Sequence, residues 1–211
     1  MKAELLNHSG TDLTVVNAAR VSFDKEHKEF DSEKDSKLIH YLAIHGHWTP
    51  FSHCTITVRE TIPIFVARQR IRHTVGFSYN EVSRRYVETE PEFYVPVNWR
   101  AKAENKKQGS SDEVICTEKE VNLEKYHKLS LDFYNNLLKL GVCPEQARIV
   151  LPLSTYTSWY VTGSLYAWAR AYNLRSEAHA QKEIQELAKQ WKEILEPLYP
   201  VSWKALTNGS V

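Results

Sequence analysis

Glycine and cysteine are scarce in the sequence, and their scarcity excludes several familiar sites. The 211 residues include seven glycines, none of which forms G-x-G-x-x-G or precedes a lysine. A Rossmann dinucleotide turn and a P-loop are therefore both excluded. The three cysteines, Cys54, Cys116 and Cys143, are odd in number and widely spaced. This usage suits a reducing compartment and excludes a zinc or disulfide framework.

Excess charge and long apolar runs are also missing. Lysine and arginine number 27 against 26 acidic residues, so the net charge is +1. This balance argues against a chain that binds nucleic acid or an anionic membrane over its whole surface. No apolar run approaches the roughly 18 residues of a transmembrane span. With 42% hydrophobic and 25% charged residues, we expect a folded cytoplasmic protein with no nucleic-acid or membrane partner.

Hydrophobic periodicity predicts both helices and strands. The pattern indicates a strand over residues 53–62, and helices over residues 35–45, after Pro63, and over residues 121–140, 144–150, 154–172 and 176–195, the last with Ser176 as N-cap. The polar, unpatterned residues 98–120 predict a mobile loop. This order predicts an α+β fold, with residues 1–211 forming a single domain.

Arginine is concentrated between residues 59 and 85. The segment contains six arginines, two glutamates and no lysine, a local charge of +4. Guanidinium groups offer planar, bidentate donors that match phosphate. The pattern fits a surface helix with ion pairs, a nucleotide- or RNA-binding module, or a site for a phosphorylated small molecule.

Three histidines raise another alternative, a metal-dependent hydrolase. His45, His47 and His53 lie before and at the start of the predicted strand. Imidazole is a common metal ligand, but H-x-H on a loop is a weak signal. We expect no metal.

Six ordered blocks resemble the flavin-dependent thymidylate synthase family, whose signature is an R-H-R triplet, a short spacer and S-x-N-E-x-S-x-R-Y. Residues 72–74 read R-H-T and residues 78–86 read S-Y-N-E-V-S-R-R-Y. Similar blocks occupy residues 18–23, 45–53, 63–69, 147–153 and 173–181. Thr74 departs from the triplet, and the spacer before Ser78 is one residue longer, with Gly76 available to absorb it.

This resemblance implies a methyltransferase of dTMP biosynthesis. It would methylate dUMP reductively, with methylene-tetrahydrofolate as carbon donor and NADPH-reduced FAD as hydride source, and without a covalent enzyme nucleophile. The resemblance also implies a largely antiparallel sheet packed by several helices, and a homotetramer whose active sites lie between subunits.

Site residues follow from the resemblance by position. Those implied for dUMP are Gln69, Arg72, Glu81, Val82, Ser83, Arg84, Arg85, Arg148 and Arg175. Those implied for FAD are Ser22, Thr49, Arg72, His73, Thr74, Glu81 and His179. Polar flavin contacts of some members correspond to Ser164, Tyr166 and Arg170 here, so that part of the contact set is not carried over.

Chemistry assigns roles within this set. Arg85 and Arg148 are the candidates for the phosphate. Arg175 is the principal catalytic candidate, because a guanidinium against the uracil imide lowers the cost of forming its anion. By resemblance alone, His47 is a second candidate, catalytic or substrate-positioning, because it is similar to a family histidine on the folate and nicotinamide side of the flavin. Ser83 is assigned to binding, because arginines around Glu81 would weaken that carboxylate as a base.

Overall fold

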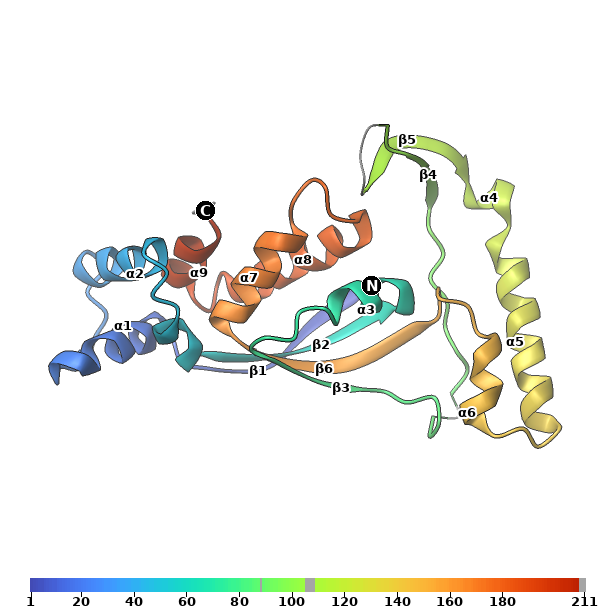
Figure 1. Cartoon of the computed structure of the whole chain (residues 1–211), viewed down its shortest axis with the longest axis horizontal. Coiled ribbons are helices and arrows are strands. Elements are labelled where there is room, and N and C mark those ends of the chain that lie inside the picture. Colours follow the sequence, from blue (N-terminus) through green and yellow to red (C-terminus); the bar gives the residue numbers. More distant parts are fainter. Residues whose placement is uncertain (88, 105–108, 209–211) are drawn as a thin grey trace. The chain divides into compact units, whose positions relative to one another are not determined.

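The protein is described by a computed structural model that covers residues 1–211, of which 88, 105–108 and 209–211 are not described (Figure 1). Its strands are β1 (Lys2–Ser9), β2 (Thr55–Pro63), β3 (Phe77–Glu81), β4 (Asn98–Lys102), β5 (Ser110–Thr117) and β6 (Tyr156–Ser164). The α-helices are α1 (Asp12–Arg20), α2 (Lys34–Ile44), α3 (Ile64–Arg70), α4 (Glu118–Val121), α5 (Leu123–Lys139), α6 (Pro144–Ala147), α7 (Leu165–Arg175), α8 (Lys182–Leu195) and α9 (Pro200–Thr207). Short 3-10 helices are η1 (Val21–Phe23), η2 (Thr49–His53) and η3 (Arg148–Val150).

Four strands form one sheet in the order β1-β2-β6-β3, and β4 pairs with β5 in a separate antiparallel sheet. Side-chain hydrogen bonds fix the register of β2 against β6: Thr57 meets Thr162 at 2.9 Å, and Arg59 donates to the Tyr160 hydroxyl at 2.6 Å. Because the numbers rise on one strand as they fall on the other, these strands are antiparallel. The predicted α+β class is confirmed.

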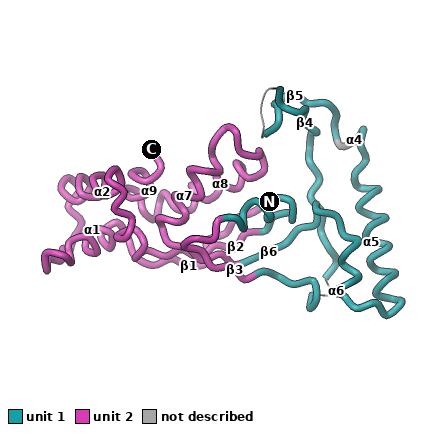
Figure 2. The backbone as a smooth tube through the Cα atoms, in the orientation of Figure 1, with its two compact units in different colours: residues 1, 61–72, 81–159 teal, residues 2–60, 73–80, 160–211 magenta. Residues whose placement is uncertain are grey.

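The chain divides into two compact units (Figure 2). Unit 1 comprises Met1 with residues 61–72 and 81–159, and unit 2 comprises residues 2–60, 73–80 and 160–211. The boundaries after residues 60, 80 and 159 fall inside β2, β3 and β6, and the boundary after residue 72 falls between α3 and β3. Of the predicted site residues, those of the dUMP set other than Arg175 belong to unit 1. Those of the FAD set other than Arg72 and Glu81 belong to unit 2.

Unit 2 has a core rich in tryptophan. Trp168 on α7, Trp191 on α8 and Trp203 on α9 are fully buried. Trp168 donates its indole N–H to the Ile56 carbonyl on β2 at 3.2 Å and meets Trp191 edge-on. Figure 1 shows α7 and α8 lying over one face of β1 and β2. Burying such large rings stabilises a helix on a sheet by several kcal/mol in total, about 1.5–3 kcal/mol for each large side chain, so α7 is a rigid support for the residue at its end, Arg175.

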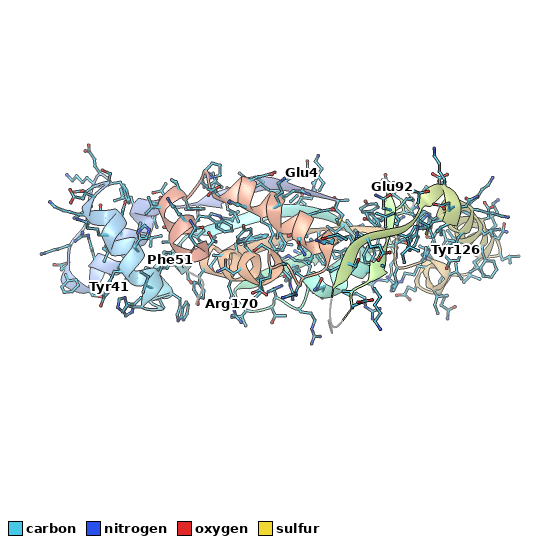
Figure 3. The ribbon with its side chains drawn as sticks, turned by 90° about the horizontal axis from the view of Figure 1, so that it is seen from above. Glu4, Tyr41, Phe51, Glu92, Tyr126 and Arg170 are labelled. Carbon is cyan, nitrogen blue, oxygen red and sulfur yellow. The ribbon has the colours of Figure 1, made fainter. Side chains whose placement is uncertain are left out.

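In unit 1 the long helix α5 packs against α6 and η3 through its polar side. His127 bonds the Ser154 hydroxyl at 2.7 Å, and Ser130 donates to the Val150 carbonyl at 2.7 Å. The predicted helix is confirmed, but its apolar positions lie on the exposed side. Tyr126 (Figure 3), Leu129, Phe133 and Leu140 are 54%, 61%, 55% and 80% exposed.

The structure corrects two predicted helices. Residues 154–172 contain β6 before α7 begins, because Trp159 and Val161 are buried on alternate positions of a strand. The helix expected to start at Ser176 starts at Lys182, and Ser176 instead is the C-cap of α7, donating its N–H to Tyr172.

Residues 98–120, predicted as a loop, include β4, β5 and most of α4, and residues 105–108 lie outside the described residues. Register shifts on both sides of Arg100 break the polar–apolar alternation that a sequence pattern requires. Among the described residues, no helix combines the length and apolar character needed to cross a membrane.

Candidate active site

The segment after α3 turns sharply where the family triplet lies. The Phe77 N–H donates to the Thr74 carbonyl at 3.2 Å, and Gly76 has φ +79°. This is the left-handed region that glycine adopts without strain. A Cβ on Gly76 would lie 2.9 Å from the Cβ of Ala167 on α7. Gly76 therefore lets the longer spacer press against the start of α7, where its carbonyl accepts from Ser164 at 3.2 Å.

Two predicted residues from different sets meet in unit 2. Arg175, the last residue of α7, donates its Nε–H to Nε2 of His73 at 2.8 Å. Tyr79 on β3 donates its hydroxyl to the His73 carbonyl at 2.7 Å. Because a guanidinium is a donor only, Nε2 of His73 must be unprotonated, and the ring carries its proton on Nδ1. The ring is therefore neutral.

In unit 1 the two phosphate candidates share one acidic neighbour. Arg85 lies 3.5 Å from a carboxylate oxygen of Glu145, and Arg148 donates Nε–H to the Glu145 carbonyl at 3.3 Å. Nε of Arg85 also donates to the Ser83 hydroxyl at 3.1 Å, and its guanidinium lies over the ring of Tyr86. The ion pair is solvent-exposed, so it contributes at most about 1 kcal/mol. An arriving phosphate can displace it.

The other dUMP candidates of unit 1 are held by nearby backbone and hydroxyl groups. Thr157 donates to Glu81 at 2.5 Å, and the Val82 N–H donates to the Ser158 carbonyl at 2.8 Å. Arg84 donates to the Thr89 carbonyl. The Gln69 side-chain oxygen is buried and has no hydrogen-bond partner among the described residues. An orphaned acceptor of this kind is costly unless a ligand donor satisfies it.

At the end of α2, three rings of unit 2 form an exposed stack. Tyr41 stacks on His45 with centroids 4.1 Å apart, and His47 lies nearly parallel to Tyr41 at 6.0 Å. Figure 3 labels Tyr41 on α2. Nearby in the chain, the ring of Trp48 lies beside that of Tyr166 on α7, with the two ring centroids 6.0 Å apart. Flat exposed rings can stack on another flat ring, such as a pterin or a nicotinamide.

The remaining flavin candidates of unit 2 are exposed and lie outside the α-helices and strands. They are Ser22 in η1, Thr49 at the start of η2, Thr74 in the glycine turn and His179 between α7 and α8. Ser164 caps α7 by accepting from the Ala167 N–H at 3.2 Å, and Arg170 is exposed. Arg72, the last residue of unit 1 before the turn, is also exposed.

The metal alternative gains no support. No three His, Cys, Asp or Glu side chains gather as metal ligands within the described part of the chain. His45 and His47 belong to the ring stack, and His45 Nδ1 also lies 2.9 Å from the Tyr41 carbonyl.

Glu145 and Tyr41 contact candidate site residues and were not predicted from the sequence. Glu145 lies three residues before Arg148, on the same helical turn, and Tyr41 lies four residues before His45. Helical spacing could have suggested both.

Comparison with known proteins gives one consistent family. The family described as "Thymidylate synthase complementing protein" matches residues 4–201. Flavin-dependent thymidylate synthase of Thermosipho africanus is 42% identical over 204 residues, covering 95% of this chain and 88% of the relative. That of Thermotoga neapolitana is 42% identical over 202 residues, covering 96% and 88%.

Solved structures agree over nearly the whole length. A UMP/dUMP methylase of Streptomyces cacaoi bound with 5-Br dUMP superposes with a TM-score of 0.83 at 34% identity, covering 98% of this chain and 94% of that one. The same methylase bound with 5-Br UMP gives 0.86 at 32% identity, covering 98% and 93%.

Proposed function

The chain belongs to the flavin-dependent thymidylate synthase family, and from this premise we propose that it methylates dUMP reductively to dTMP. The observation that carries the proposal is the 42% identity to named flavin-dependent thymidylate synthases over 95% of the chain. The carbon donor would be methylene-tetrahydrofolate, and NADPH would supply the reducing equivalents. The metal-hydrolase and RNA-binding alternatives lack comparable support.

The direct test is anaerobic. The purified protein should be yellow, with a flavin absorption band. With the flavin reduced beforehand, addition of dUMP and methylene-tetrahydrofolate should give dTMP in one turnover. A colourless protein that neither takes up FAD nor forms dTMP would overturn the proposal.

The residues of unit 2 fit a flavin without a glycine-rich loop. The tight turn at Gly76 exposes Thr74 and places His73 beside Arg175. These groups offer hydroxyl, imidazole and guanidinium partners for phosphate and ring atoms. FAD would supply hydride transfer, and Ser22, Thr49, His73, Thr74 and His179, together with Arg72 and Glu81, would hold it.

The residues of unit 1 fit a nucleoside monophosphate. Arg85 and Arg148 would bind the phosphate in place of Glu145, since charge-assisted bidentate bonds to a dianion are stronger than an exposed ion pair. The orphaned oxygen of Gln69 would accept an N–H of the ligand. Val82, Ser83, Arg84 and Arg72 would complete the pocket, with Glu81 as an acceptor for a sugar hydroxyl.

Ser83 would bind rather than attack. Its hydroxyl accepts from Nε–H of Arg85 at 3.1 Å. A serine becomes nucleophilic when a base takes its proton, and a neighbouring guanidinium cannot act as a base. The absence of a covalent dUMP adduct on Ser83 after turnover, measured by mass spectrometry, is the expected result.

Arg175 would act on the uracil ring electrostatically, by stabilising negative charge that develops on the imide. His47, in the exposed ring stack, would position the carbon donor or the nicotinamide. Because this stack presents flat apolar faces beside two imidazoles, it suits both ligands.

A homotetramer is the proposed assembly. The apolar stripe of α5, defined here as Tyr126, Leu129, Phe133, Leu137 and Leu140, follows helical spacing and is largely exposed in the single chain. An exposed stripe of this length on an amphipathic helix is typical of a protein–protein interface.

A second substrate, UMP, is favoured by one observation. The solved relatives at 34% and 32% identity are described as UMP/dUMP methylases, one of them bound with 5-Br UMP. Replacing dUMP by UMP in the anaerobic assay should then give 5-methyl-UMP. Formation of dTMP alone would restrict the activity to deoxynucleotides.

A further inference from the structure

His73 and Arg175 lie 102 positions apart in the chain and form one 2.8 Å hydrogen bond within unit 2. The bond uses Nε of Arg175, which lies in the plane of the guanidinium. One Nη–H of a guanidinium points parallel to Nε–H, so the bond to His73 leaves the end-on pair of Nη–H donors facing another direction in the same plane. The imidazole is therefore one contact that sets the direction of these paired donors.

His73 is held by contacts that do not involve Arg175. The Tyr79 hydroxyl bonds its carbonyl at 2.7 Å, and the turn from Thr74 to Phe77 follows immediately. Gly76 in that turn lies against α7, so the turn cannot move toward this helix. Arg175 is the last residue of α7, and its side chain reaches His73 from the end of that helix.

We propose that His73 is a positioning residue for Arg175: its unprotonated Nε2 holds the guanidinium in the orientation that stabilises charge on the pyrimidine. The resemblance assigns His73 to the flavin, whereas this role acts through the arginine. The inference rests on the proposed function, because the pyrimidine is the ligand that Arg175 would face.

The kinetic test uses a double-mutant cycle. His73→Leu removes the acceptor, and His73→Gln keeps one, since Oε1 of glutamine falls near the position of Nε2. In single-turnover oxidation of the reduced flavin by dUMP and methylene-tetrahydrofolate, we expect His73→Leu to lower the rate by about 10–100-fold, the cost of misplacing a catalytic group. His73→Gln should recover the rate to within a few-fold of wild type, and His40→Gln, at an exposed histidine of α2 outside the candidate set, is the matched control.

The cycle separates the two roles. In an Arg175→Ala background, His73→Leu should change the remaining rate by less than twofold, because the group it positions is gone. If the two losses multiply instead, His73 acts on the reaction independently of Arg175 and the positioning role is overturned.

An independent measurement does not need activity. In protein carrying ¹⁵N-histidine, the His73 ring should be the Nδ1–H tautomer, and Arg175→Ala should move it toward the Nε2–H tautomer. If the wild-type protein makes no dTMP, the proposed function fails while this readout still tests the contact. A wild-type Nε2–H tautomer would overturn the inference even if dTMP forms.

Discussion

Arg20 donates through Nη2 to Oδ1 of Asp35 at 3.0 Å, and Asp35 is fully buried. The other oxygen of Asp35 accepts from the Asp31 N–H at 2.9 Å and lies 3.1 Å from Nδ1 of His27. Burial alone would raise the pKa of Asp35. The hydrogen bonds from Asp31, His27 and Arg20 outweigh it, so the pKa falls below its ordinary value of 3.8. This carboxylate ties the end of α1 to the start of α2.

Asp35→Asn should therefore destabilise the protein by about 3 kcal/mol at pH 7, because it removes one charge of a largely buried ion pair. A group whose pKa is lowered by folding contributes stability above its unfolded pKa and loses it as the pH falls through the folded value. The difference between the variant and wild type should therefore be largest at neutral pH and shrink below about pH 4. Urea unfolding at pH 7 and at pH 3 measures the destabilisation at neutral pH and its decrease at low pH. Asp132→Asn, on the exposed side of α5, is the control and should change little.

Arg85→Ala should weaken dUMP binding. Losing a charge-assisted bond to a phosphate costs about 1.5–3 kcal/mol, or roughly 10–100-fold in affinity. Equilibrium binding of dUMP should show this loss, whereas deoxyuridine, which has no phosphate, should bind wild type and variant equally. Arg68→Ala on α3, which is exposed and outside the candidate site, is the matched control. An equal loss for deoxyuridine would remove Arg85 from the phosphate site.

Much of the architecture near the site could be predicted locally. The helix over 35–45 corresponds to α2, and the strand over 53–62 to β2, because each carries its own period of buried residues. The helix after Pro63 corresponds to α3, which Pro63 caps. The predictions that were wrong concern segments whose structure depends on partners distant in the sequence. Residues 156–161, half of which are aromatic, were read as part of a helix, and pairing with β2 and β3 makes them a strand.

In the candidate site, too, sequence motifs identify single residues but not the contacts between residues distant in the sequence. Sequence motifs name Arg175 and His73 but assign them to different ligands, because their contact closes a 102-residue separation that no spacing rule encodes. Likewise, Arg85 and Arg148 were expected at one phosphate, and helical spacing relates Glu145 to Arg148, but the contact between Glu145 and Arg85 becomes visible only in the structure.

Gly76→Ala and Gly46→Ala form a matched pair that separates backbone strain from crowding. Both glycines have positive φ, +79° and +69°, so alanine costs about 1–2 kcal/mol at either position. Only at Gly76 does the new Cβ also meet another atom, the Ala167 Cβ at 2.9 Å, whereas nothing lies within 4 Å at Gly46. Thermal unfolding should show Gly76→Ala to be the more destabilising, by about a further 1 kcal/mol or more. Equal losses would mean that the turn can move away from α7.

Phe133→Glu should break the proposed tetramer. Phe133 lies in the middle of the apolar stripe of α5 and is 55% exposed in the single chain, so a carboxylate there costs little in an isolated subunit. Buried at an interface, the same charge would be desolvated without a partner, at a cost of several kcal/mol. Light scattering after size-exclusion chromatography should show a fall in mass, with unchanged far-UV circular dichroism.

The matched control is Lys128→Glu, which introduces the same side chain on the opposite, exposed side of the same helix. Its mass should equal that of wild type. If the flavin lies between subunits, the smaller species formed by Phe133→Glu should also lose FAD, because dissociation removes part of each binding site. A Phe133→Glu protein that stays tetrameric would assign the stripe to another role, and one that dissociates yet keeps its flavin would place the cofactor within a single chain.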